Sequence, residues 1–285
     1  MKRFDELLHD GYGQSFEVTR VLYRDKTEHQ DLIIFDTPTL GRVMALDNIV
    51  QVTTRDEFVY HEMLTHVPMF ARQCLHGAVR DVLIIGGGDG GILREVLRHN
   101  SVERATMVEI DGTVVDLCKE YFPDISMGAF DDPRTDLIID DGVKFVAETD
   151  RRYDVIIVDS TDPIGPGEVL FTESFYASCR RCLKDGGVLV TQNGVPFFQG
   201  GEVTTTNQRM GRVFAANGFY TAVVPTYIGG FMTLGWGTDD PALKEVSLDD
   251  LQEAFAQSGL ETCYYTPEMH KASFALPQFI KDLMV

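Results

Sequence analysis

The stretch VLIIGGGDGGILRE, residues 82–95, carries the pattern that decides the fold. Four apolar residues lead into a glycine-rich turn, and a helix-like sequence follows it at once. Glycines at such a junction let a ligand approach the backbone closely at the carboxyl edge of a sheet. The turn contains Gly86, Gly87, Gly88, Gly90 and Gly91. We therefore predict a nucleoside-binding loop, with a tight structural turn as the alternative.

Beyond residue 80, strand-like runs rich in Val, Ile and Leu alternate with helix-like segments. This alternation is typical of a parallel sheet covered on both faces. The strand-like runs are DVLIIGGG (81–88), RATMVEI (104–110), TDLIIDDG (135–142), YDVIIVDS (153–160) and GVLVTQN (187–193), and a helix is expected at 203–218. The last two runs, TAVVPTY (221–227) and FMTLGWGT (231–238), are too close for a parallel crossover, so they are predicted to be antiparallel. We predict an α/β fold with a methyltransferase-like Rossmann sheet, mostly parallel, that ends in an antiparallel hairpin.

Residues 15–54 contain four shorter β-like runs joined by turn-like connectors. They are SFEVTRVLYRDKT (15–27), QDLIIFDT (30–37), GRVMALD (41–47) and IVQVT (49–53). Short antiparallel strands form a small β domain that must pack on another surface. From Asp56 to about Leu75 the apolar spacing becomes helical. We expect an N-terminal β-strand domain over residues 1–55 and a catalytic α/β domain over residues 56–285.

The composition limits the classes of partner. The chain of 285 residues has a net charge of −19, which argues against nucleic acid and anionic membranes because both require a basic surface. No apolar stretch reaches the length of a membrane span, and MKRFDELLHD at the start is too polar for a signal peptide, so we expect a cytoplasmic protein. Cys179 and Cys182 form a single CxxC inside a helix-like segment, which favours buried thiols over a metal or redox site.

Carboxylates follow the predicted strands, at the edge of the sheet where ligands bind. Asp89 lies inside the glycine turn, where it favours a cationic or neutral group over a phosphate. Asp140 and Asp141 can accept from an adenine amino group or cap the next helix. Asp159 and Asp162, in DSTDPIGPGE, precede a stiff loop and are interpreted as a cation-binding, proton-accepting pair; helix caps or a metal site are the alternatives.

Four further residues are candidates for the same site. Glu109 ends the strand about 20 residues beyond the glycine turn, where ribose hydroxyls are usually held. Tyr60 and His61 lie in RDEFVYHEM on the predicted helix, and Tyr227 precedes the turn of the terminal hairpin. Each of these last three is equally interpretable as a structural residue.

Together, IIGGGDGG, VEID, DSTDPIGPGE and RDEFVYHEM resemble the polyamine aminopropyltransferases, most closely the bacterial spermidine synthases. The resemblance covers nearly the whole chain, including YRDKTEHQDLIIF and PTYIGGFMTLGW. It implies a homodimer or tetramer that transfers an aminopropyl group from decarboxylated S-adenosylmethionine to putrescine. The implied products are spermidine and 5′-methylthioadenosine, and neither a metal nor a bound cofactor is implied.

The resemblance also assigns roles to residues that match the family motifs. At the nucleoside end, Gln30 and Glu109 would hold the ribose, Asp140 and Asp141 the adenine, Asp89 the aminopropyl ammonium, and Pro166 would line the pocket. Tyr60, His61, Gln51 and Tyr227 would line the amine channel, Asp162 would bind the diamine and Asp159 would take its proton. Thr54 departs from the family, many members of which carry Glu there; this would change the polarity of the pocket and leaves the choice of diamine open.

Two other functions share these features: an S-adenosylmethionine-dependent amine methyltransferase, and a non-catalytic protein that binds nucleosides or polyamines. Asp89 argues against the methyltransferase, because the carboxylate of S-adenosylmethionine would fall near it with no Lys or Arg in the turn. Two like charges about 4 Å apart repel by about 4 kcal/mol at an effective dielectric near 20. The Asp159–Asp162 pair argues against the non-catalytic protein.

Overall fold

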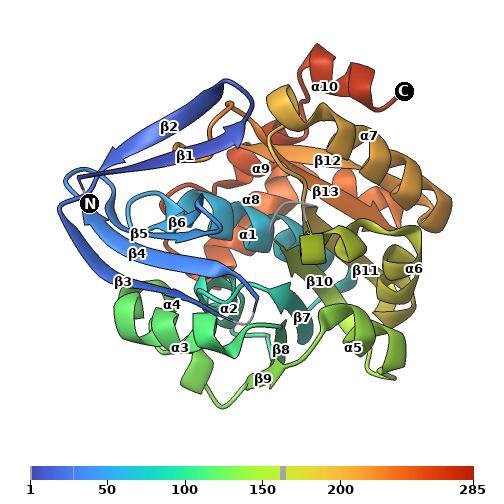
Figure 1. Ribbon diagram of the computed structural model, residues 1–285. Coiled ribbons are helices and arrows are strands. Elements are labelled where there is room, and N and C mark those ends of the chain that lie inside the picture. The colour runs from blue at the N-terminus through green and yellow to red at the C-terminus, as the bar shows by residue number, and fades with distance from the viewer. Residues whose placement is uncertain (1, 28, 161–164) are drawn as a thin grey trace.

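The computed structural model describes residues 2–27, 29–160 and 165–285, and a seven-stranded sheet forms its centre (Figure 1). The strands lie in the order β12-β13-β11-β10-β7-β8-β9. They are β7 (Asp81–Gly86), β8 (Arg104–Glu109), β9 (Thr135–Ile139), β10 (Tyr153–Asp159), β11 (Leu183–Gln192), β12 (Ala216–Ala222) and β13 (Met232–Thr238). All neighbouring pairs from β11 to β9 are parallel, whereas β13 is antiparallel to both β11 and β12. The predicted sheet with its terminal antiparallel hairpin is confirmed.

Helices cover both faces of this sheet (Figure 1). One face carries α1 (Glu57–His76) and α2 (Gly91–Leu97), with α8 (Leu248–Ser258) packed on α1, and α9 (Pro267–Ser273) in contact with α8 and β12. The other face carries α5 (Gly142–Glu148), α6 (Glu173–Cys182) and α7 (Pro196–Val213). Successive residues of a strand point to opposite faces. Accordingly, Ile84 and Ile157 belong to the core under α1, while Ile85 and Val158 belong to the core under α6. The remaining helical segments are α3 (Gly112–Tyr121), α4 (Pro123–Ser126), α10 (Gln278–Leu283), η1 (Ala129–Asp131), η2 (Gly165–Phe171) and η3 (Pro241–Lys244).

The described part of the N-terminal region contains six strands where four were predicted. They are β1 (Arg3–His9) and β2 (Tyr12–Glu17), which form a hairpin, and β3 (Arg20–Lys26), β4 (Asp31–Thr37), β5 (Gly41–Leu46) and β6 (Ile49–Thr53), which form an antiparallel sheet. The run 15–27, predicted as one strand, is interrupted at Val18 and Thr19. Strand β1 was missed because one of its buried positions, Glu6, is charged and hides the alternation of apolar residues.

Two elements near the terminal hairpin differ from their predicted bounds. Helix α7 ends at Val213 instead of continuing to residue 218, and β12 starts at Ala216. Asn217 and Gly218, which have poor strand propensity, pair with β13. The connection between β12 and β13 therefore spans residues 223–231 rather than three residues. The ladder with the neighbouring strand, and not local composition, decides this boundary.

The connection between β12 and β13 is fixed from three directions. Thr226 donates from its backbone N–H and its hydroxyl to Asp56, at 2.9 and 2.7 Å, just before α1. Its carbonyl accepts from Gln14 of β2 at 2.7 Å, and the hydroxyl of the neighbouring Tyr227 donates to the carbonyl of Gln51 in β6. The connection is thus anchored both to α1 and to the N-terminal strands. None of the helices in the described ranges is long and apolar enough to cross a membrane.

Candidate active site

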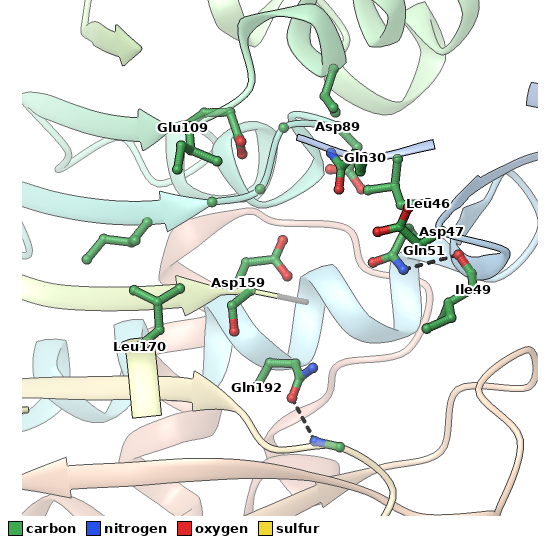
Figure 2. Close-up of a pocket in the computed structure, with 18 of the residues that line it drawn as sticks. Gln30, Leu46, Asp47, Ile49, Gln51, Asp89, Glu109, Asp159, Leu170 and Gln192 are labelled. Atoms are coloured by element: carbon green, nitrogen blue, oxygen red, sulfur yellow. Dashed lines mark hydrogen bonds between the residues drawn. The ribbon is translucent and has the colours of Figure 1, made fainter. Parts of the chain in front are cut away.

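A cavity of about 330 Å³ lies where the carboxyl ends of the central strands meet the N-terminal β region. Glu109, Asp159 and Gln192 face it from the ends of β8, β10 and β11 (Figure 2). Gln30 and Gln51 reach it from the N-terminal side. Parallel strands of an open α/β sheet bind ligands at this edge, so the predicted location of the site agrees with the position of the cavity.

The glycine turn passes very close to the end of β10. Gly86 and Gly87 have φ values of 84° and 76°, a region that residues with a side chain rarely adopt. A Cβ atom at Gly86 would lie 1.9 Å from the carbonyl oxygen of Asp159. Glycine at this position therefore lets the turn lie directly against the end of β10, and Asp89 and Asp159 line the same cavity.

Asp159 is half-buried at the end of β10 and accepts a hydrogen bond of 2.6 Å from the hydroxyl of Tyr60 on α1. Burial and then the nearby Asp89 carboxylate raise the pKa of Asp159 to about 6, against the opposing effects of Tyr60 and His61. Burial and the Asp159 carboxylate raise the pKa of Tyr60 well above its ordinary value. At neutral pH this pair consists of a carboxylate acceptor and a neutral phenol donor.

Asp89 has a cationic partner that the sequence did not reveal. Its Oδ2 lies 3.2 Å from Nε2 of His61, and its Oδ1 accepts from the backbone N–H of Gly91 at 2.8 Å. A Cβ atom at Gly91 would lie 2.2 Å from the ring of His61, so the last glycine of the turn makes room for this contact. Burial opposes ionisation of Asp89, but the charge of His61 outweighs it and lowers the pKa of Asp89. The glycine turn holds no Lys or Arg, but α1 places His61 beside Asp89 as a partner for its charge.

Glu109 is buried at the end of β8, where its Oε1 accepts from the backbone N–H of Asp111 at 2.9 Å. Burial raises the pKa of Glu109 to about 7 although this hydrogen bond lowers it. Gln30, also a predicted nucleoside ligand, donates to the side chain of Asp111 at 3.3 Å. The two residues predicted to hold the ribose therefore share Asp111 as a neighbour and line the same cavity.

The two acids that end β9 lie in different surroundings. Asp141 lines the cavity and also caps α5, accepting from the N–H of Val143 at 2.7 Å. Asp140 is exposed, accepts from the N–H of Asp141 at 2.8 Å, pairs with Lys144, and is not among the described residues that line the cavity. The helix-cap interpretation is correct for Asp141, and its exposed carboxylate remains available to a ligand.

The predicted amine-channel residues converge from three elements. The rings of Tyr60 and Tyr227 meet edge to face with centroids 5.8 Å apart, and both line the cavity. Gln51 lines it too, with its side chain donating to the carbonyl of Ile49 at 3.1 Å (Figure 2). Thr54 is exposed, and its hydroxyl accepts from the N–H of Arg42 at 3.0 Å. Thr54 therefore does not change the polarity of the described cavity, contrary to expectation.

Two predicted residues are not covered by the description, and several residues that line the cavity were not predicted, Glu6 and Gln192 among them. Asp162 lies outside the described residues, as does the side chain of Pro166. Buried Glu6 of β1 and Gln192 at the end of β11 line the cavity without having been predicted. Gln192 follows the same rule that identified Asp159, a polar residue at the carboxyl end of a central strand, whereas Glu6 lies on a strand that the sequence did not indicate.

Family models match almost the whole chain in two consecutive parts. The model described as the spermidine synthase tetramerisation domain matches residues 4–54, and that described as the spermine/spermidine synthase domain matches residues 57–249. Cys179 and Cys182, which lie within the second match, are buried free thiols in α6, as predicted.

Individual proteins match over nearly their full length. Polyamine aminopropyltransferase 1 of Pseudomonas aeruginosa is 59% identical, with 98% of this chain and 96% of that protein covered. The polyamine aminopropyltransferase of Serratia proteamaculans is 57% identical with the same coverage of both chains. A crystal structure of spermidine synthase with the transition-state analogue AdoDATO has a TM-score of 0.92 and 39% identity, over 99% of this chain and 94% of the other. Spermidine synthase from Thermotoga maritima has a TM-score of 0.90 and 38% identity, with 99% and 93% covered.

Proposed function

This chain belongs to the spermine/spermidine synthase family, and from that premise we propose that it transfers an aminopropyl group from decarboxylated S-adenosylmethionine to putrescine. The products would be spermidine and 5′-methylthioadenosine. One observation carries the proposal: Asp159, hydrogen-bonded to Tyr60 at 2.6 Å, faces the same cavity as Asp89. A site that brings two cationic substrates together needs buried negative charge, and the nucleophilic amine needs a proton acceptor.

We assign the nucleoside to the side of the cavity formed by β8 and the glycine turn. Glu109, together with Gln30, would bind the ribose hydroxyls, and Asp141 with Asp140 would accept from the adenine amino group. Asp89 would receive the ammonium of the aminopropyl group, with Pro166 lining the pocket. Positions 86 to 88 have no side chains, which supports this assignment because a nucleoside can then lie directly against the backbone.

The diamine would enter between Tyr60, Tyr227 and Gln51, with Asp162 binding one ammonium and Asp159 taking a proton from the reacting one. The freed nitrogen forms a bond to the carbon beside the sulfonium. The bond from that carbon to sulfur breaks, and its electrons remain on sulfur, which leaves as a neutral thioether. An alkylammonium has a pKa near 10, so a carboxylate with a pKa of about 6 accepts its proton at a cost of about 5 kcal/mol. Turnover should therefore increase toward alkaline pH.

The organisation of the protein remains part of the proposal. We propose that residues 1–55 and 56–285 act as two domains and that the chain assembles as a homodimer or tetramer. The match of residues 4–54 to a tetramerisation domain supports assembly through the N-terminal strands. Light scattering on the full chain distinguishes a dimer from a tetramer. A variant with charged substitutions on the N-terminal strands tests whether assembly occurs through them.

The test of the reaction is incubation with decarboxylated S-adenosylmethionine and a panel of diamines, with products identified by mass. We expect spermidine and 5′-methylthioadenosine from putrescine, and lower yields from cadaverine and longer diamines. A parallel reaction contains S-adenosylmethionine in place of the decarboxylated form. Methylated amine from that reaction, without aminopropyl transfer in the first, would identify an amine methyltransferase; binding of both substrates without any product would identify a non-catalytic protein.

A further inference from the structure

His61 lies between two carboxylates in the wall of the cavity. Its Nδ1 is 2.6 Å from Oε2 of Glu57, and its Nε2 is 3.2 Å from Oδ2 of Asp89. The side chain is only 2% exposed, so water does not serve as an alternative partner. A neutral imidazole has one donor and one acceptor nitrogen, and its acceptor would face a carboxylate oxygen. Two carboxylates on opposite ring nitrogens therefore indicate an imidazolium that donates to both.

Glu57 is itself held in place by Arg94 of α2. The guanidinium of Arg94 donates to both carboxylate oxygens of Glu57, at 3.2 and 3.0 Å, in the bidentate geometry that fixes a carboxylate most firmly. The same guanidinium donates to Glu95 at 2.8 Å and to the carbonyl of Ile125 at 2.7 Å. Arg94 thus holds Glu57 from the side away from the cavity. Neither residue is among the described residues that line the cavity.

The charges around His61 come from four elements. Glu57 and the phenol of Tyr60 face it from α1, Asp89 from the glycine turn, Arg94 from α2 beyond Glu57, and Asp159 from β10. Burial lowers the pKa of His61, but Asp89 and Glu57 outweigh this effect and raise it to about 10. The positive charge in turn acts to lower the pKa of both Asp89 and Asp159.

Two carboxylates in one cavity without a cation share a proton, and their titrations cannot be assigned to either one. We propose that Glu57, anchored by Arg94, is a positioning residue that keeps His61 charged, and that the charged His61 separates the roles of the two carboxylates. Asp89 then stays ionised as a fixed ammonium partner, and Asp159 remains free to titrate as the base. The inference about the roles rests on the proposed function, whereas the charge state of His61 does not.

The first experiment follows the ring nitrogens of His61 by NMR in the ligand-free protein across pH. In the wild type we expect both nitrogens to remain protonated to at least pH 9. In Glu57→Gln the pKa of His61 should fall by about one to three pH units, because one opposite charge is removed. Glu103→Gln is the matched control, since Glu103 pairs with Arg80 on the surface and should leave His61 unchanged. A His61 pKa near the ordinary histidine value in the wild type would overturn the inference, as would the same His61 pKa in Glu57→Gln and Glu103→Gln. Neither outcome depends on any activity.

The second experiment tests the effect on the carboxylates with His61→Gln, which keeps a donor and removes the charge. We follow the carboxyl carbon of Asp159 by NMR in the ligand-free protein and expect the pKa of Asp159 to rise by about one pH unit or more. The pKa of the acid limb of the kcat/KM profile should rise by the same amount. His270→Gln is the control, because burial lowers the pKa of His270 to about 3 and its removal takes away no charge. An unmoved Asp159 titration in His61→Gln overturns the inference. Absence of aminopropyl transfer in the wild type would instead contradict the proposed function and leave the NMR result to decide.

Discussion

Asp159 differs from an ordinary aspartate in both its surroundings and its protonation. It accepts from the neutral phenol of Tyr60, and burial together with Asp89 raises its pKa to about 6. The ionised form predominates above that value and can accept a proton, while the protonated form below it cannot. A base with this pKa is active at neutral pH and is lost on mild acidification.

In Asp159→Asn the amide oxygen can still accept from Tyr60, but no proton acceptor remains. We expect turnover to fall by about 10²- to 10⁴-fold, with nearly unchanged binding of 5′-methylthioadenosine in calorimetry. In the wild type, kcat/KM should rise as pH increases through about 6, because the ionised carboxylate is the active form. Near-normal turnover in the variant would exclude Asp159 as the base.

Gly91 offers a steric test of the contact between the glycine turn and α1. A Cβ atom there would lie 2.2 Å from the ring of His61, so Gly91→Ala should displace that ring. We expect a loss of about 1–3 kcal/mol in the free energy of unfolding, typical of overpacking, together with weaker binding of the decarboxylated nucleoside. Gly201→Ala in α7 is the control, because a Cβ there meets nothing within 4 Å and should be neutral or stabilising. If urea unfolding gives the same free energy of unfolding for both variants, the His61 ring moves aside without loss of stability.

At the scale of elements, α1 connects the site to the rest of the protein. One side of the helix carries Tyr60 and His61 toward the cavity. Glu62, next in sequence, is buried and accepts three backbone N–H bonds, from Cys263 at 2.7 Å, Tyr264 at 2.8 Å and Tyr265 at 2.7 Å. The segment after α8 is thus hydrogen-bonded to the helix that carries Tyr60 and His61.

Glu62→Ala should leave these three N–H groups without their acceptor. Because an unsatisfied buried donor costs about 1–3 kcal/mol, we expect the free energy of unfolding to fall by about 3 kcal/mol or more. Glu253→Ala, on the exposed face of α8, should change it by less than about 0.5 kcal/mol. Urea titrations of both variants provide the measurement, and a Glu62→Ala protein as stable as the control would show that the segment repacks.

The elements that the sequence predicted best are those with a strong local pattern. The apolar runs of β7, β8 and β10 and the helical spacing of α1 are visible in the residues themselves. Strand β12 begins in Ala-Asn-Gly, which acquires its extended form from pairing with β13. The contact between His61 and Asp89 forms because α1 packs against the glycine turn, and no local sequence pattern indicates that these two segments meet. The sequence therefore located the candidate site by strand ends, but it did not reveal how the side chains pair within it.

At the scale of the whole molecule, the cavity belongs to both parts of the chain. Glu6, Gln30 and Gln51 from the N-terminal strands line it opposite Asp159 and Glu109. Hydrogen bonds from Gln14 to Thr226 and from Tyr227 to Gln51 join the two parts, and Tyr227 and Gln51 also line the cavity. Because residues from both parts line the cavity, changes in how these parts pack should alter substrate binding as well as assembly.

The net charge of −19 should also act on the proposed substrates before they bind. A negative field raises the local concentration of a dication such as putrescine, and salt screens that field over a Debye length of about 10 Å at 0.1 M. We therefore expect kcat/KM for putrescine to fall by about 3- to 10-fold between about 10 and 150 mM salt, with a smaller change in kcat. The affinity for uncharged 5′-methylthioadenosine, measured by calorimetry over the same range, is the control and should stay nearly constant. If kcat/KM for putrescine does not change with salt, the acidic surface does not steer the substrate, and its charge serves solubility alone; a parallel loss of 5′-methylthioadenosine binding would show that salt acts on the site itself.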